Sequence, residues 1–499
     1  MMPQNLIAST SDLGHLSSDT PIPAFLIGGT TSGSGKTTLT LGILAAFAAR
    51  GLTVQPFKCG PDFIDPTLHR MVTGRISSNL DLRMCGREFC RDTFHQRLSG
   101  HDVGVVEGVM GLFDGGPSSS AALAEALALP VVLVIDARSA AESVAAVLKG
   151  FEVYNPDVQI KGVIFNRVGS DRHVELIRGA VEQSCQAQIL GFFPRDIRFE
   201  IPDRHLGLHM GEEAPLNAIQ LAGLIAAVEK HINLDALLSL GASRGGQQVV
   251  SSFQYPARPL PPSLAPAALG HPWPSPLPSP LAPTASGHPC RSPLKLAVAR
   301  DLPFCFYYED NLAILEKAGF ELLLFSPLND QKLPEGMDAL YLGGGYPELH
   351  AEALSRNVSM RSAIAAWAHG GGVIHAECGG FMYLCEELID LEGKVHAMAG
   401  VFPATVRMQS RLSRLGYRQP RLKMDCLWGK KGEVLHGHEF HYSVIDRMTP
   451  DVETIYQLED GRKEGFKVGN TVGGYLHLHF GQTEKNVDAF YNYIWQMQN

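Results

Sequence analysis

The chain has 499 residues, and because a single hydrophobic core seldom grows beyond roughly 250–300 residues, this length predicts two or three domains. Its formal net charge is −9 with both signs spread along the chain, which excludes the basic footprint of a nucleic-acid-binding protein. The nine cysteines are odd in number and form no Cys-x-x-Cys pair, which argues against a disulfide scaffold or structural zinc site and favours a reducing cytoplasm.

The N-terminal segment, residues 1–20, is expected to be disordered. It has neither the basic start nor the apolar core of a targeting signal. The most apolar stretch, Ala121–Ala137, is interrupted by Glu125, Pro130 and Asp136, so no membrane segment is expected. These features predict a cytoplasmic protein.

Residues 21–245 are predicted to form an α/β domain with a doubly wound parallel sheet. Short β-rich runs alternate there with helix-like stretches, as in parallel strands joined by helical crossovers. Helical periodicity returns over Leu216–Leu240, just after Pro215. The predicted strands are Ala24–Ile27, Val54–Phe57, Val103–Val106, Val131–Ile135 and Lys161–Phe165.

A phosphate-binding loop is predicted between the first strand and the first helix, where residues 29–38 read Gly-Thr-Thr-Ser-Gly-Ser-Gly-Lys-Thr-Thr. Glycines let backbone N–H groups turn toward phosphate oxygens, Lys36 would contact the outer phosphates, and Thr37 would place its hydroxyl on Mg²⁺. A plain Gly-rich turn is the alternative. Because Thr30 replaces the usual glycine, the spacing is Gly-x5-Gly-Lys, which resembles the dethiobiotin synthetase branch of P-loop proteins. The candidate ATP-binding residues are Gly29, Ser32, Gly33, Ser34, Gly35, Lys36, Thr37 and Thr38.

Acidic residues follow two neighbouring predicted strands. Asp62 and Asp65 come after Val54–Phe57, and Glu107 and Asp114 come after Val103–Val106. Ligands of doubly wound sheets bind outside the carboxyl ends of the strands, so these carboxylates should converge on the nucleotide. Mg²⁺ requires such hard oxygen ligands. Taken singly, each residue is equally well explained as a helix cap or turn residue.

A proline-rich tether, residues 246–293, is predicted to separate two domains. It has almost no charge and no periodicity, so it cannot pack a core of its own and should be extended or disordered. Regular patterns resume in a second predicted α/β domain, residues 294–499. Its first predicted strands are Leu294–Ala299, Glu321–Phe325 and Ala339–Leu342.

Cys378 is predicted to be a nucleophile. Gly370–Ala376 reads as a strand and Gly379–Leu384 as the start of a helix, which places Cys378 on a strand-to-helix elbow. Helix N–H groups at such an elbow lower the thiol pKa and can form an oxyanion hole. The common alternative, a buried and inert thiol, is the interpretation for the other eight cysteines.

Several ordered strings resemble the cobyrinic acid a,c-diamide synthase family, which activates a tetrapyrrole carboxylate with ATP and amidates it with ammonia from glutamine. The resemblance covers nearly the whole chain except residues 1–20 and the tether. The strings are Phe57-Lys-Cys-Gly-Pro-Asp-Phe-Ile-Asp-Pro66, Asn79-Leu-Asp81, Glu107-Gly-Val-Met-Gly-Leu-Phe-Asp-Gly115, Asn166-Arg-Val168, Asp203-Arg-His-Leu-Gly-Leu208, Phe304-Cys-Phe-Tyr-Tyr-Glu-Asp-Asn-Leu312, Gly343-Gly-Gly-Tyr-Pro-Glu348, Ala376-Glu-Cys-Gly-Gly380, Gly437-His-Glu-Phe-His441 and Gly474-Tyr-Leu-His-Leu-His479.

In the synthetase domain, this resemblance implies a dethiobiotin synthetase-like fold and a set of residue roles. Asp65 and Asp114 would assist catalysis at the phosphorylated carboxylate or the incoming ammonia. Asn166 would lie at the adenine, and Lys58 would meet the substrate carboxylate or the transferred phosphoryl group. Asp62 and Glu107, together with Thr37, would hold Mg²⁺.

In the second domain, the resemblance implies a class I (triad) glutamine amidotransferase-like fold. His477 would be the base for Cys378, and backbone N–H groups near Gly344 and at Gly379 would form the oxyanion hole. The usual ending of that family is His-x-Glu, whereas this chain has His479 in the third place. Either another acidic group orients His477 or a Cys–His dyad suffices.

The segment His436-Gly-His-Glu-Phe-His441 differs from the zinc motif His-Glu-x-x-His. Only one residue separates Glu439 from His441, so helical ligands would not share a face. Because the family carries the same Gly-His-Glu-Phe-His string, a role in structure or domain coupling is favoured over a metal site.

The expected reaction is ATP- and glutamine-dependent amidation of the a- and c-acetate carboxylates of cobyrinic acid, through a phosphorylated carboxylate. Hydrogenobyrinic acid and nickel sirohydrochlorin are alternative substrates. The expected cofactors are ATP and Mg²⁺, and the expected partners are the tetrapyrrole, L-glutamine and a second copy in a homodimer. One rival is a P-loop regulatory ATPase with an inert glutaminase-like domain, but such ATPases carry a signature lysine where this chain has Thr31.

Overall fold

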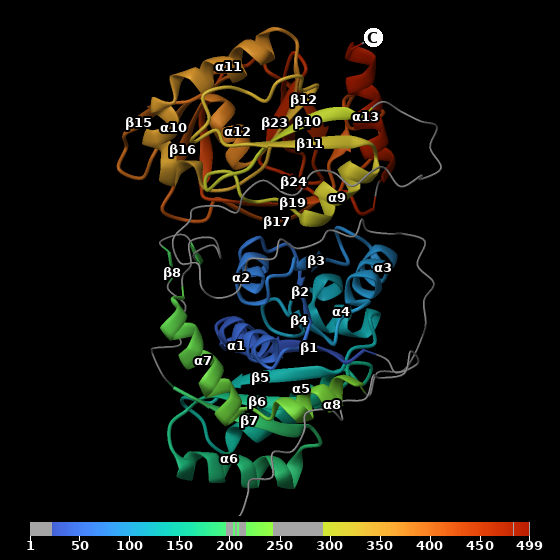
Figure 1. Ribbon diagram of the computed structural model, residues 1–499, viewed down its shortest axis with the longest axis vertical. Coiled ribbons are helices and arrows are strands. Elements are labelled where there is room, and N and C mark those ends of the chain that lie inside the picture. Colours follow the sequence, from blue (N-terminus) through green and yellow to red (C-terminus); the bar gives the residue numbers. More distant parts are fainter. Residues whose placement is uncertain are drawn as a thin grey trace, which may run out of the picture.

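The computed structural model describes residues 22–195, 203–204, 207–208, 216–242, 293–482 and 484–498. Residues 22–242 and 293–498, called here the N-terminal part and the C-terminal part, each build an α/β arrangement around their own main sheet (Figure 1). The predicted α/β class is therefore confirmed. Residues 1–20 and nearly all of the predicted tether lie outside the described residues, and the predicted domain boundaries stay predictions.

The N-terminal part contains a seven-stranded sheet in the order β3-β2-β4-β1-β5-β6-β7, and all of its pairings are parallel. Its central strands are continuous apolar runs, as expected for a sheet that is covered on both faces. All five predicted strands are present. The strands are β1 Ala24–Gly29, β2 Val54–Cys59, β3 Ser78–Leu80, β4 Val103–Glu107, β5 Val131–Asp136, β6 Ile160–Val168 and β7 Gln188–Pro194.

Helices cover both faces of this sheet. One apolar core packs α1, α7 and α8 against one face, and a second packs α3 to α6 against the other. The predicted helix Leu216–Leu240 is two helices, because Asn233 caps α8 by accepting a hydrogen bond from the N–H of Ala236. The helices are α1 Lys36–Ala49, α2 Ile64–Thr73, α3 Arg87–Leu98, α4 Ser120–Ala126, α5 Ser143–Tyr154, α6 Asp171–Ser184, α7 Ala218–His231 and α8 Leu234–Ala242; a short pair, β8 Asp203–Arg204 and β9 Gly207–Leu208, stands apart.

The C-terminal part is built on an eight-stranded mixed sheet in the order β11-β10-β12-β13-β23-β22-β21-β18. The strands from β11 to β23 are parallel and the remaining pairings are antiparallel. The three predicted strands correspond to β10, β11 and β12. The strands are β10 Leu294–Ala299, β11 Phe320–Phe325, β12 Ala339–Leu342, β13 Val373–Glu377, β18 Arg421–Leu422, β21 Glu453–Gln457, β22 Lys463–Val468 and β23 Thr471–Gly474.

Two smaller sheets accompany it, with the orders β15-β14-β16-β20 and β17-β19-β24. Their strands are β14 Cys385–Ile389, β15 Val395–Ala397, β16 Phe402–Met408, β17 Arg414–Arg418, β19 Gly437–His441, β20 Ser443–Met448 and β24 His477–Leu478. The helices of this part are α9 Glu309–Lys317, α10 Ala351–Arg356, α11 Val358–His369, α12 Gly379–Leu384 and α13 Glu484–Gln498.

The two parts meet where α2, β3 and α3 face α9, β17 and β19 (Figure 1). Asp310, which is 1% exposed, accepts hydrogen bonds from Arg97 at 3.1 Å and from the Ser78 hydroxyl at 3.1 Å. The Tyr417 hydroxyl donates to Asp81 at 2.7 Å. These buried polar contacts join segments more than 200 residues apart in sequence and fix how the parts face each other.

Candidate functional site

The predicted phosphate loop connects β1 to the N-terminus of α1. Gly33 and Gly35 have φ angles of 75° and 92°, which glycine adopts without steric cost. These conformations let the loop turn its backbone N–H groups inward. The Lys36 ammonium donates to the carbonyl of Met110 at 2.6 Å and to that of Thr31 at 3.3 Å. Ser34 Oγ is buried and has no hydrogen-bond partner within the described ranges, so this donor is available for a phosphate oxygen.

A buried ionic network lies beside the loop, at the carboxyl ends of β2 and β4. Glu107 Oε1 accepts from Thr37 Oγ1 at 2.7 Å and lies 3.3 Å from Lys58 Nζ. Lys58 Nζ also lies 2.5 Å from Asp65 Oδ2. The structure therefore brings four of the predicted residues together at the carboxyl ends of these strands, where they were expected to converge: Thr37, Lys58, Asp65 and Glu107.

Charge balance within this network keeps Glu107 and Lys58 ionised, whereas burial, with the nearby charges of Asp62 and Glu107, raises the pKa of Asp65. Burial opposes the charge of Glu107, but Lys58 and the hydrogen bond from His69 outweigh burial and hold the pKa of this carboxyl below its usual range. His69 Nε2 lies 2.7 Å from Glu107 Oε2, and the other ring nitrogen lies 2.9 Å from Ser77 Oγ. Burial likewise opposes the Lys58 charge, and Asp65 with Glu107 raises the pKa of Lys58. His69 was not predicted from the sequence.

The remaining predicted residues of the N-terminal part surround the same loop. Asp62 Oδ1 accepts hydrogen bonds from the N–H groups of Ile64 and Asp65. This side chain therefore caps α2, which was the alternative to a role as a magnesium ligand. Asp114 is exposed and accepts from the N–H of Gly111 at 3.0 Å. Asn166 donates to the carbonyl of Ser34 at 2.9 Å, which places it against the phosphate loop.

Cys378 lies between β13 and α12, as the elbow prediction required. Its φ of 46° and ψ of −101° are strained for a residue with a side chain. Two hydrogen bonds hold the turn, from its own N–H to the carbonyl of Gly474 at 2.7 Å and from the N–H of Met382 to its carbonyl at 2.9 Å. Such a turn directs the thiol away from the strand.

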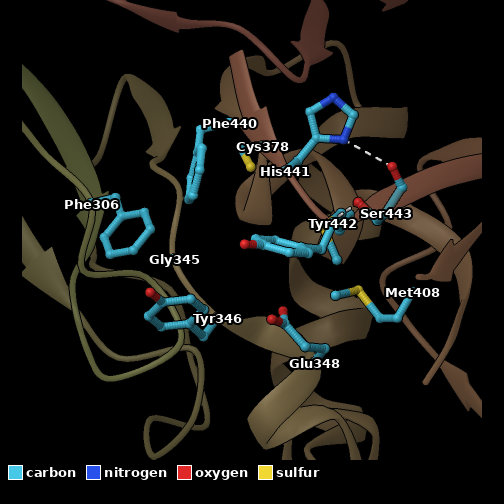
Figure 2. Close-up of a pocket in the computed structure, with 11 residues that line it drawn as sticks. Phe306, Gly345, Tyr346, Glu348, Cys378, Met408, Phe440, His441, Tyr442 and Ser443 are labelled. Carbon is cyan, nitrogen blue, oxygen red and sulfur yellow. Dashed lines mark hydrogen bonds between the residues drawn. The ribbon is translucent and has the colours of Figure 1, made fainter. Parts of the chain in front are cut away.

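A pocket opens at Cys378. Burial, together with the negative charge of Glu348, raises the pKa of the Cys378 thiol, and the N–H of Gly379 opposes that rise. Figure 2 shows the Glu348 carboxylate pointing into the pocket, below the thiol. The thiol therefore requires a base to form its thiolate. The pocket is lined by Phe306, Gly345, Tyr346, Glu348, Cys378, Met382, Met408, Phe440, His441, Tyr442 and Ser443.

The predicted base, His477, begins β24 and is 1% exposed. Burial and the neighbouring His438 and His441 hold the pKa of His477 well below its usual value, so the imidazole is neutral and able to accept a proton. The loop at Gly344 touches its edge, because a Cβ added at position 344 would lie 2.3 Å from His477 Cε1. The two predicted oxyanion-hole glycines lie close together, since a Cβ at Gly379 would lie 3.0 Å from the backbone nitrogen of Gly345, the residue after Gly344.

The orienting acid, which the sequence left open, has a candidate in Glu377. Its Oε2 lies 3.9 Å from His477 Nδ1. His479, which occupies the usual place of the acid, instead packs against Tyr308 and Phe89, with ring centroids 4.8 and 5.6 Å apart. Glu377 precedes the nucleophile in the string Ala-Glu-Cys-Gly-Gly, which was the signal available in the sequence.

Phe63 connects the two candidate sites. It lies between Asp62 and Asp65 in sequence, and its ring centroid is 5.0 Å from that of His477. The same ring stacks on Phe306 at 5.0 Å with an interplanar angle of 5°. A side chain of the N-terminal part thus forms one wall around the predicted base of the C-terminal part.

The segment His436–His441 contributes to both the interface and the pocket. At the interface, the His438 ring lies 5.7 Å from that of Phe63, and within the C-terminal part it lies 5.1 Å from that of His477. His441 stacks on Tyr475 at 3.8 Å and lines the pocket at Cys378. No group of three or more His, Cys, Asp or Glu side chains in the described part of the chain is arranged to hold a metal ion.

Within the described ranges, no helix combines the length and the apolar character of a membrane-spanning helix.

Comparison with known proteins agrees with both halves of this geometry. Residues 25–208 match a family described as the CobQ/CobB/MinD/ParA nucleotide binding domain. Residues 295–485 match one described as the CobB/CobQ-like glutamine amidotransferase domain. The fold class predicted for each part is thus confirmed.

Curated relatives match nearly the full length. A protein of Streptococcus sanguinis named cobyrinate a,c-diamide synthase is 39% identical over 482 residues, which cover 94% of this chain and 98% of the relative. Proteins of the same name from Salmonella typhimurium and Caldanaerobacter subterraneus are each 38% identical; their matches cover 92% and 93% of this chain and 95% and 97% of the relatives.

Proposed function

Because the chain belongs to the cobyrinate a,c-diamide synthase family, we propose that it amidates the a- and c-acetate carboxylates of cobyrinic acid. The protein is an ATP-dependent glutamine amidotransferase, a carbon–nitrogen ligase of cobalamin biosynthesis. The observation that carries the proposal is the contact between its two sites: Phe63, which lies between Asp62 and Asp65 in sequence, packs on His477. Ammonia released in the C-terminal part is therefore formed beside the part that binds ATP.

In the N-terminal part, the chemistry is activation of a carboxylate. A carboxylate is a poor acyl donor because oxide would be its leaving group, so the γ-phosphoryl group of ATP is transferred to it first. Lys36 and the loop N–H groups position the phosphates and offset the charge that develops during transfer. Ammonia then attacks the acyl carbon, and the carbon–oxygen bond to phosphate breaks.

The residues present fit a magnesium ion. The Thr37 hydroxyl and a Glu107 carboxylate oxygen meet 2.7 Å apart beside Lys36, and both are hard oxygen donors. Asp62 keeps a second carboxylate oxygen that could join them. When bound, Mg²⁺ would neutralise charge on the phosphate oxygens.

The other residues are assigned the roles that the resemblance to the family implies. Asp65 and Asp114 would act at the phosphorylated carboxylate or the incoming ammonia, and Asn166 would lie near the adenine. Lys58 would contact the substrate carboxylate or the transferred phosphoryl group. Its pairing with Asp65 and Glu107 would have to loosen for that contact, since both anions already neutralise it.

In the C-terminal part, the chemistry is hydrolysis of glutamine. His477 takes the thiol proton as Cys378 Sγ attacks the side-chain amide carbon, and the oxyanion would be stabilised by backbone N–H groups at Gly344 and Gly379. The proton then passes to the leaving nitrogen, which departs as ammonia, and water releases glutamate. Glu348 suits the α-ammonium group of glutamine because it presents a carboxylate to the same pocket.

The organisation proposed with this function has residues 21–245 as the synthetase domain, 246–293 as a linker and 294–499 as the glutaminase domain, in a cytoplasmic homodimer.

The experiment that tests the substrate is a direct comparison of macrocycles. The purified protein is incubated with ATP, Mg²⁺ and glutamine and with cobyrinic acid, hydrogenobyrinic acid or nickel sirohydrochlorin. Amides formed are then counted by mass. Two amides on cobyrinic acid, formed faster than on the other two macrocycles, are expected. Faster diamidation of another macrocycle would reassign the substrate, and no amidation of any would refute the proposed reaction.

A further inference from the structure

One nitrogen of His477 has no assigned partner in the proposed glutaminase site. His477 Nδ1 is buried and makes no hydrogen bond to the described residues. Its nearest charged neighbour is Glu377, whose Oε2 lies 3.9 Å away, with both side chains no more than 3% exposed. That separation is too long for a hydrogen bond. It is short enough for an ion pair in a buried site, where water does not screen the charge.

Other donors hold the Glu377 carboxylate in this position. Its Oε1 lies 3.1 Å from the N–H of Leu478 and 3.1 Å from His375 Nε2. Its Oε2 accepts from the Tyr341 hydroxyl at 3.2 Å. A carboxylate oxygen can accept more than one hydrogen bond, so Oε2 keeps the capacity to accept from His477.

The bond to Leu478 also ties Glu377 to the backbone beside the histidine. Leu478 follows His477 in β24, and Cys378 follows Glu377 after β13. The Glu377 carboxylate therefore comes from β13, which leads into Cys378, and it contacts β24, which carries His477.

We propose that Glu377 is the positioning residue of the glutaminase site, supplying the carboxylate that position 479 lacks. It holds His477 in the tautomer with its proton on Nδ1, which leaves Nε2 to accept the proton of the Cys378 thiol, and it stabilises the imidazolium that results. This inference rests on the proposed roles of Cys378 and His477.

The other ionisable groups around His477 make this negative charge necessary. His438 and His441 on β19 face the base, and the Tyr308 hydroxyl, just before α9, lies 3.3 Å from His438. Burial lowers the pKa of His438 to about 3 and that of His441 to about 4, so neither carries a charge at neutral pH. A proton arriving on His477 therefore depends on Glu377 for compensation.

The test is Glu377→Gln in the full-length protein, with Glu386→Gln as a control, because Glu386 is an exposed carboxylate paired with Arg447. The amide keeps the shape and still accepts from Leu478 but removes the charge. We expect glutaminase kcat to fall by about 100-fold with KM for glutamine within twofold. The acidic limb of the pH profile should move to lower pH, because loss of the anion disfavours the imidazolium. Amidation driven by ammonium chloride should be unchanged, and Glu377→Asp should recover part of the activity.

Two results would overturn the role of Glu377. One is a glutaminase kcat within threefold of the parent; the other is an equal loss of the glutamine- and ammonia-driven reactions with an unmoved pH limb, which would make Glu377 structural only. If Glu377→Gln fails to fold, Tyr341→Phe is measured instead, because it removes one support of the carboxylate while keeping the charge; the pH limb should then stay in place, and a glutaminase kcat within threefold of the parent would overturn the role. Cys378→Ala, measured in parallel, distinguishes failure of the proposed function from failure of this inference. If this variant still uses glutamine, Cys378 is not the nucleophile, and that conclusion does not depend on the result for Glu377.

Discussion

At the scale of single residues, the glutaminase site depends on how closely backbone approaches the histidine. A Cβ at position 344 would meet His477 Cε1 at 2.3 Å, a distance that no relaxed contact allows. We therefore expect Gly344→Ala to push the imidazole out of place and lower glutamine hydrolysis by about 100-fold, because displacement of a reacting group by about 1 Å costs that much. Steady-state glutamate release measures the effect.

The control for that substitution is Gly179→Ala. Gly179 lies in α6, where an added Cβ meets nothing within 4 Å, so activity should not change. Ammonia-driven amidation should survive in both variants. Full glutaminase activity in Gly344→Ala would show that the histidine is not held by this loop.

Several residues of the site could be predicted from sequence because their chemistry depends on local order. The phosphate loop and the Cys378 elbow each need one short string between a strand and a helix. Glu377 and His69 were missed for the opposite reason: each acts on a residue that is distant in sequence, His477 or Glu107. Only the fold brings those pairs together.

At the scale of elements, the start of α2 belongs to both sites. Asp62 caps this helix, and Phe63 extends from it to His477. We expect Phe63→Ala to uncouple the reactions, lowering glutamine-driven amidation by about 10-fold relative to ammonia-driven amidation, a typical coupling between sites. The measured quantity is the ratio of glutamate released to amide formed, which should rise above that of the parent.

Phe151→Ala is the matched control for Phe63→Ala. Phe151 is a partly buried aromatic residue of α5, packed on Phe113 at 5.5 Å and remote from the interface. Its loss should reduce stability without altering the ratio of glutamate to amide. An unchanged ratio in Phe63→Ala would refute a coupling role for the start of α2.

Strand β22 carries a buried carboxyl group, Glu464, that makes the stability of the protein depend on pH. Burial raises the pKa of Glu464 from 4.5 to about 7, and its Oε1 accepts from the N–H of Tyr475 at 2.5 Å. Between these pH values the unfolded chain ionises Glu464 while the folded chain keeps it protonated. Stability should therefore fall as pH rises from 4.5 to 7, by about 3 kcal/mol from this group.

Glu464→Gln should remove that dependence, because the amide has the same shape and no charge to bury. The thermal midpoints of the two proteins should be similar near pH 4.5. The midpoint of the variant should exceed that of the parent by a margin that grows up to pH 7 and is constant above it. Parallel midpoint curves across this range would contradict the buried protonated carboxyl.

Elements could be predicted where a hydrophobic pattern was long and regular. The runs Leu294–Ala299 and Ala339–Leu342 match β10 and β12 residue for residue. The three-residue β3 and the small sheets around β14 and β19 were not predicted, because short or polar strands are fixed by pairing with distant partners and carry little periodicity. The break between α7 and α8 depended on a cap at Asn233, which hydrophobic periodicity alone does not reveal.

At the scale of the whole molecule, function depends on how the two parts face each other. The contact surface combines the buried Arg97–Asp310 pair with the aromatic cluster around Phe63. Composition predicted two units and a tether, but the orientation of the units comes from these contacts, which no local pattern encodes. The interface sets the ATP-binding part directly against His477, the proposed base.

Cys378 is proposed to release the nitrogen that the part carrying the phosphate loop then uses. The most direct measurement is amidation by Cys378→Ala with ATP, Mg²⁺ and cobyrinic acid, supplied with either glutamine labelled with ¹⁵N in its side-chain amide or ammonium chloride. We predict no labelled product from glutamine and amidation within about twofold of the parent from ammonium, because the substitution leaves the N-terminal part unchanged. Labelled diamide from glutamine, or loss of the ammonium reaction in a folded variant, would contradict this role of Cys378.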